Sequence, residues 1–194
     1  MIELPEGLDR SVYPLAWFVG EFTGSGKLGG NFGIPDREFE SSAKWVSNGE
    51  QLDYSLTLEV DGKPYITESG IWKIAESRPE TLIDELRFPV QAEISTTWIG
   101  DGEPRDGNVS TKSWTTRYVG VVGYGKMELL SDEIALHEPE LELGDFAVND
   151  LFRSKRIFGW VNNRILWAWD IALIGAHSGE ENELKSIAAG GLWK

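Results

Sequence analysis

Leu15-Ala-Trp-Phe-Val-Gly-Glu-Phe-Thr-Gly-Ser-Gly26 is a stretch in which two kinds of residue alternate with a period of two. From Phe18 on, Phe and Gly residues fall on one side, and the polar residues Glu21, Thr23 and Ser25 fall on the other, which predicts a β-strand with one apolar and one polar face. A glycine packs nothing in a strand and weakens it. Gly20, Gly24 and Gly26 on one face therefore indicate either a sharp bend of a barrel wall or close contact with a ligand, and the sequence leaves both explanations open.

The same alternation recurs along most of the chain. Gln51 to Val60 gives five consecutive matches, and Asp61-Gly62 then predicts a hairpin turn into the next strand, Tyr65 to Ile74. About ten such segments are separated by connections rich in Ser, Gly, Pro and Asp, and most connections are short enough for neighbouring strands to pair antiparallel. We predict an all-β fold, a ten-stranded antiparallel up-and-down β-barrel, lipocalin-like or calycin-like in class.

This barrel is expected to occupy residues 1–194 as one domain, with residues 1–14 as a lead-in that contains a short helical turn at Glu6 to Val12. A barrel of this strand number has an interior wider than its own side chains easily fill, so the fold class predicts a cavity. Strand parity, together with the opening motif, assigns the following residues to a ligand pocket: Phe22, Thr23, Trp45, Tyr54, Trp72, Trp167 and Trp169.

Composition excludes several classes of partner. The 18 Lys and Arg residues are outnumbered by 32 Asp and Glu residues, and the net charge is −14. Such a surface repels nucleic-acid phosphates and anionic lipids, so neither nucleic acid nor a membrane is an expected partner. The chain has no cysteine, which excludes disulfides, thiolate catalysis and cysteine-based metal sites. The N-terminal residues lack the features of a signal peptide, and we expect a cytoplasmic location.

Three titratable residues need separate interpretation. Glu68 shares the apolar face of its strand, so it is either a member of a structural ion pair or hydrogen-bond network, or an acid of the pocket. His137 and His177 are the only histidines, and both stand in polar, loop-like surroundings. We interpret them as exposed loop histidines and predict no metal site.

Three motifs together resemble the nitrobindin family. Gly20-Glu-Phe22-Thr-Gly24-Ser-Gly26 resembles the family's G-x-W-x-G-x-G signature, with Phe22 in the tryptophan position. Glu68-Ser-Gly-Ile-Trp-Lys73 is similar to the family's E-x-G-F-W-R, and the segment from Arg156 to Ala172 resembles a late strand pair of actinobacterial members. Spread over most of the chain, the matches are fairly specific together and weak singly.

The resemblance implies a ten-stranded barrel, related in shape to fatty-acid-binding proteins, that holds haem b through one histidine near the C-terminus. It further implies binding of nitric oxide and isomerisation of peroxynitrite to nitrate. Matching backwards from Leu192-Trp193-Lys194 puts Ile187 at the position of that histidine, whereas counting forwards from Asp170 ends near Glu181. Neither residue offers an imidazole nitrogen to iron. The chain is therefore most similar to the ferric nitrobindin-like branch, which keeps the barrel and lacks the haem-ligating histidine.

Three functions remain open at this point. In the first, the barrel is a binding module for a small hydrophobic or planar ligand, with no catalytic residue and no cofactor expected. In the second, it is a haem b-dependent peroxynitrite isomerase that uses a non-standard iron ligand such as His177. In the third, bulky side chains fill the interior and the barrel is a scaffold for surface contacts. A homodimer fits the family resemblance.

Overall fold

A computed structural model describes residues 7–31, 34–76, 86–100, 111–131, 134–135, 151–174 and 183–194. Within these ranges the chain forms one short 3-10 helix and eleven strands. The elements are η1 (Arg10–Phe18), β1 (Gly20–Leu28), β2 (Arg37–Asn48), β3 (Gln51–Val60), β4 (Lys63–Ile74), β5 (Phe88–Trp98), β6 (Lys112–Gly123), β7 (Lys126–Ser131), β8 (Ile134–Ala135), β9 (Leu151–Val161), β10 (Arg164–Ile174) and β11 (Lys185–Trp193).

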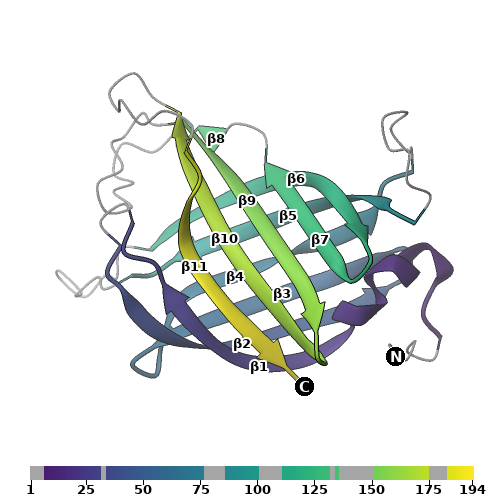
Figure 1. Ribbon diagram of the computed structural model, residues 1–194, viewed down its shortest axis with the longest axis horizontal. Coiled ribbons are helices and arrows are strands. Elements are labelled where there is room, and N and C mark those ends of the chain that lie inside the picture. The colour runs from purple at the N-terminus through teal and green to yellow at the C-terminus, as the bar shows by residue number, and fades with distance from the viewer. Residues whose placement is uncertain are drawn as a thin grey trace.

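The strands close into an antiparallel barrel (Figure 1). Its ten long strands follow the order β10, β11, β1 to β7 and β9, and the pairing of β9 with β10 closes the ring. The two-residue strand β8 pairs with the start of β9. The predicted ten-stranded antiparallel barrel is confirmed. Among the described residues, no helix has the length and apolar character that crossing a membrane requires.

Buried and exposed residues alternate along the barrel wall because successive side chains of a strand point to opposite faces. In β2 this alternation runs without interruption from Glu38 to Val46. Tight hairpins connect several neighbours, and the predicted turn at Asp61-Gly62 is present, with φ of 53° and 71°. Asn162 and Asn163 have φ of 50° and 61°, which matches the type I′ turn that suits two-residue hairpins.

One end of the barrel is covered by η1, drawn in purple in Figure 1. The Asp9 side chain caps the helix by accepting a hydrogen bond of 2.8 Å from the backbone N–H of Ser11. The helix therefore begins at Arg10 and ends at Phe18, later than the turn predicted at Glu6 to Val12. Because η1 takes up the start of the stretch that reads as a strand, β1 begins only at Gly20.

Candidate functional site

The glycines of the opening motif lie where the barrel wall bends. A Cβ built on Gly24 would stand 1.9 Å from the carbonyl oxygen of Gly191, and one on Gly26 would stand 2.2 Å from that of Ala189. The main chain of β11 is thus what approaches these glycines, which supports the bend of a barrel wall over direct ligand contact. Gly20 differs, because its φ of 133° is itself a conformation that favours glycine.

Four of the predicted pocket residues, Phe22, Trp45, Tyr54 and Trp72, meet at the end covered by η1. The ring centroid of Trp45 lies 5.8 Å from Phe22, 5.0 Å from Tyr54 and 5.4 Å from Trp72. Phe18 of η1 inserts among them, 5.1 Å from Trp45 and 4.8 Å from Trp72. These five residues form an aromatic plug that closes this end of the barrel, so they border the interior at this end.

The centre of the barrel holds a buried ion pair. Glu68 of β4 and Arg156 of β9, both almost fully buried, come from strands that are not neighbours in the sheet. An Nη2 hydrogen bond joins the guanidinium of Arg156 to Oε1 of Glu68. Because the pair is buried and hydrogen-bonded, the structure supports the interpretation of Glu68 as a member of a structural ion pair.

Hydroxyl groups complete the surroundings of Glu68. The hydroxyl of Tyr54 donates to Glu68 Oε2 at 2.7 Å, and Thr96 Oγ1 donates to Oε1 at 3.1 Å. Each carboxylate oxygen therefore accepts at least one hydrogen bond from a neutral group in addition to the ion pair. Such partners offset the free-energy penalty of burying a charge.

Arg156 is held by a second set of contacts. Its guanidinium lies 3.7 Å from the ring centroid of Trp169, a distance typical of cation–π stacking. Its Nε donates to the hydroxyl of Tyr118 at 3.4 Å, and that hydroxyl shares a 2.8 Å hydrogen bond with Ser154. Trp169 Nε1 donates to the same Ser154 Oγ at 2.8 Å. The network fixes the guanidinium across the barrel.

The network changes the proton affinities of its members. Burial raises the pKa of the Tyr54 hydroxyl well above its ordinary range, and the Glu68 carboxylate raises it further. Burial alone lowers the pKa of Arg156, but the pKa rises overall, chiefly because of the negative charge of the Glu68 carboxylate. A neutral phenol and a charged guanidinium are the stable forms at neutral pH.

Ile187 lies inside the barrel at an irregular point of β11. The register with β10 shifts here, with Trp169 opposite Ala188 and Asp170 opposite Ser186, so that Ile187 is the extra residue of a β-bulge. The bulge breaks the alternation of faces, and both Ile187 and Ala188 are buried. Ile187 is only 1% exposed. Its aliphatic side chain occupies the interior at one of the two positions to which the motif matching leads for the family's haem ligand.

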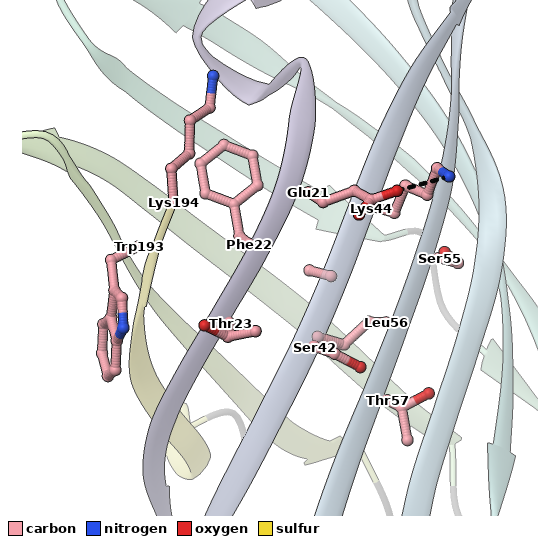
Figure 2. Close-up of a pocket in the computed structure, with 11 residues that line it drawn as sticks. Glu21, Phe22, Thr23, Ser42, Lys44, Ser55, Leu56, Thr57, Trp193 and Lys194 are labelled. Atoms are coloured by element: carbon pink, nitrogen blue, oxygen red, sulfur yellow. Dashed lines mark ion pairs between the residues drawn. The ribbon is translucent and has the colours of Figure 1, made fainter.

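A shallow groove of about 270 Å³ marks the outer wall across β1, β2 and β3 (Figure 2). Figure 2 shows Thr23, Ser42 and Thr57 on this wall, with Trp193 at one side and an ion pair of 2.8 Å between Glu21 and Lys44. The exposed side chain of Thr23 corrects the predicted pocket, because it points to solvent. The two-residue period places it opposite Phe22, on the other face of β1.

The sequence model of one protein family, described as the THAP4-like, heme-binding beta-barrel domain, matches residues 11–185. The chain belongs to this family. The resemblance to nitrobindins that the motifs indicate is thereby confirmed.

Relatives of this THAP4-like barrel carry two names. A protein of Clavibacter sepedonicus named peroxynitrite isomerase is 28% identical over 194 residues, covering 90% of this chain and 92% of the relative. A protein of Cutibacterium acnes named ferric nitrobindin-like protein is 26% identical over 184 residues, covering 90% of each chain. The crystal structure of Rv2717c from M. tuberculosis superposes with a TM-score of 0.55 at 12% identity, over 96% of this chain and 98% of that one, which shows a shared fold.

Haem, the group in the family's description, needs a donor atom for its iron. The part of this THAP4-like chain that the structure describes contains no histidine. His177, the alternative iron ligand, lies outside it, as do His137 and Glu181. Met127 is fully buried and in register with Phe158, whose ring lies 5.5 Å from Phe18 and 5.2 Å from Trp72 of the aromatic plug. Tyr54 is a poor ligand for iron, because burial keeps its hydroxyl neutral and the hydroxyl is hydrogen-bonded to Glu68. The described residues therefore offer no imidazole nitrogen to haem iron.

Sequence reasoning about this THAP4-like barrel missed half of its central network. Glu68 was identified as an inward-facing acid, but Arg156, Tyr118 and Ser154 were not identified as its surroundings. One signal for Arg156 was available, since it alternates with Ser154 and Phe158 on the inward face of β9. The pairing itself was not readable, because it joins residues 88 positions apart.

Proposed function

We propose that this protein is a binding barrel that takes a small hydrophobic or planar ligand into its interior without coordinating haem iron. The observation that supports this most is Ile187, a buried aliphatic side chain at the position assigned to the haem ligand. Trp167 and Trp169 also point inward and are buried, so the same wall offers aromatic surface to a flat ligand.

A second function has support from the relatives. Proteins named peroxynitrite isomerase share 28% identity with most of this chain. Under this alternative, haem b binds through a non-standard ligand, and His177 is the candidate. Iron would then supply the chemistry of nitric oxide binding and peroxynitrite isomerisation, and the chain would contribute the pocket walls.

Titration with hemin separates the two proposals. We expect the wild-type protein to give weak, featureless absorption, and the Ile187→His variant to gain a sharp Soret band because an imidazole now faces the interior. Ile71→His is the matched control, since Ile71 lies on the outer wall and is exposed. A sharp wild-type Soret band that disappears in His177→Ala would overturn the proposal in favour of the isomerase.

Binding of an apolar ligand is tested with the neutral dye N-phenyl-1-naphthylamine. We expect its fluorescence to rise on binding to the wild-type protein and to stay low with Ile187→Trp, which fills the interior. Ile71→Trp, which adds the same ring outside, should bind as the wild type does. If the wild-type protein gives no enhancement, the interior is filled and the barrel is a scaffold only.

A further inference from the structure

Polar groups inside the barrel are mostly paired, and Trp167 is an exception. Trp169 lies two residues further along the same inward face of β10, and it donates its indole N–H to Ser154 of β9. Trp167 is 5% exposed, and its Nε1 is buried without a hydrogen-bond partner among the described residues. A buried donor without an acceptor destabilises a protein, so this N–H needs an explanation.

Trp45 and Trp72 also have unpaired indole nitrogens, but their surroundings differ. Trp45 meets Phe22 at an interplanar angle of 84°, and Trp72 meets Phe18 at 80°. Rings nearly perpendicular to an indole can receive its N–H on their π-face, which is a weak acceptor. The aromatic plug thus places a nearly perpendicular ring beside each of these two indoles.

Among the residues that the structure describes, Trp167 has no such perpendicular ring. Its ring neighbour is Phe39, at 5.7 Å between centroids and an interplanar angle of 33°. An indole N–H lies in the plane of its ring, so a neighbour closer to parallel than to perpendicular does not present its face to that donor. The indole N–H of Trp167 is therefore a place on the inner wall where a bound ligand could accept a hydrogen bond.

A second unpaired group lies on the same side of the barrel. Ser41 of β2 is 5% exposed, and its Oγ has no partner among the described residues. Ser41 faces inward, two positions from Phe39 on β2. The ring of Phe39 packs against that of Trp167 on β10. Between these two strands, Gly26 of β1 pairs with Gly190 of β11 and adds no side chain to the wall. Two unpaired polar groups thus flank one stretch of apolar wall made of an aromatic ring and bare main chain.

We infer that the ligand of this barrel is a planar apolar molecule with a carbonyl-type acceptor, which receives the N–H of Trp167. The inference rests on the proposed function and specifies its ligand. The flat rings of Phe39 and Trp167 select planar apolar surface, and the indole edge selects an acceptor. A hydrocarbon of the same shape would leave the N–H unpaired and bind more weakly.

The matched probes fluorenone and fluorene test this preference, because they share one flat ring system and only fluorenone has a carbonyl group. By equilibrium dialysis, we expect the wild-type protein to bind fluorenone about fivefold more tightly than fluorene, the effect of one neutral hydrogen bond. Trp167→Phe keeps an aromatic ring and removes the N–H, so the preference should vanish. Trp160→Phe, whose ring packs 6.2 Å from Trp17 at the covered end, should retain it.

The outcomes distinguish the two proposals. If neither probe binds, the proposed function fails; if both bind with equal affinity to the wild-type protein, or if Trp167→Phe keeps the preference, only the inference fails. A measurement without ligand gives an independent check. Trp167→Phe and Trp169→Phe lose the same buried ring volume, but only Trp169→Phe also loses a hydrogen bond, so Trp167→Phe should lower the melting temperature less; an equal or larger decrease would contradict the unpaired N–H.

Discussion

At the scale of single residues, Glu68 and Arg156 place two opposite charges in the middle of an apolar barrel. Burying either charge alone costs several kcal/mol, and the pair is tolerable because each member has further partners. Tyr54 and Thr96 donate to the carboxylate, while Trp169 and Tyr118 contact the guanidinium. The pair therefore fixes the geometry of the interior more than it stabilises the fold.

Removal of one charge should reveal this dependence. We expect Arg156→Met to lower the free energy of unfolding by about 3–5 kcal/mol, because it leaves the Glu68 carboxylate buried without its counterion. Lys44→Met breaks an exposed ion pair with Glu21 on the outer wall and should leave the free energy of unfolding almost unchanged. Urea unfolding measures both.

A double variant completes this cycle. Glu68→Leu combined with Arg156→Met should cost less than the sum of the two single changes, since no unpaired charge remains. Additive losses would show that the two side chains do not depend on each other.

Tyr54 should titrate abnormally. Its pKa in the folded protein is raised above the ordinary value of 10.0, so the folded chain keeps a proton that the unfolded chain releases above that pH. This contribution to stability is complete below pH 10.0 and is lost as the pH rises further. We expect wild type and Tyr54→Phe to gain the same phenolate absorbance while both stay folded. A smaller gain in the variant would contradict the shift.

At the scale of elements, the glycines of β1 let the main chain of β11 come close because they have no side chain. Gly24→Ala should destabilise the barrel by at least about 2 kcal/mol, because the new methyl group meets the rigid main chain of β11. Gly159→Ala is the control: a Cβ there has no atom within 4 Å, and the change should be neutral or slightly stabilising. Thermal melting compares the two, and equal effects would contradict the packing explanation.

The elements also show what the sequence can predict. Alternation alone located β3 at its observed bounds, because each of its faces has one environment. The predicted start of β1 was wrong, since the residues of η1 fit a strand pattern until the cap at Asp9 is considered. The bulge at Ile187 was not predictable, because it depends on the register between β10 and β11, which local sequence does not encode.

At the scale of the whole molecule, the surplus of acidic residues acts against compactness. Glu40 and Glu59 stand directly opposite each other on β2 and β3, which adds local repulsion to the net charge of −14. We expect Glu59→Gln to raise the free energy of unfolding by about 0.5 kcal/mol at low salt, and the gain to shrink at high salt. Lys44→Gln, which removes a positive charge, should have the opposite sign. Salt-independent effects would exclude this electrostatic origin.

The pairing of β1 with β11 has a consequence for how the chain is made. During synthesis, β1 leaves the ribosome early and can pair with β2 at one edge, but its other partner is the last strand of the barrel. Until Trp193 has emerged, that edge stays open to any other unpaired strand. Nascent copies are therefore exposed to mispairing at this edge from the emergence of β1 until that of β11.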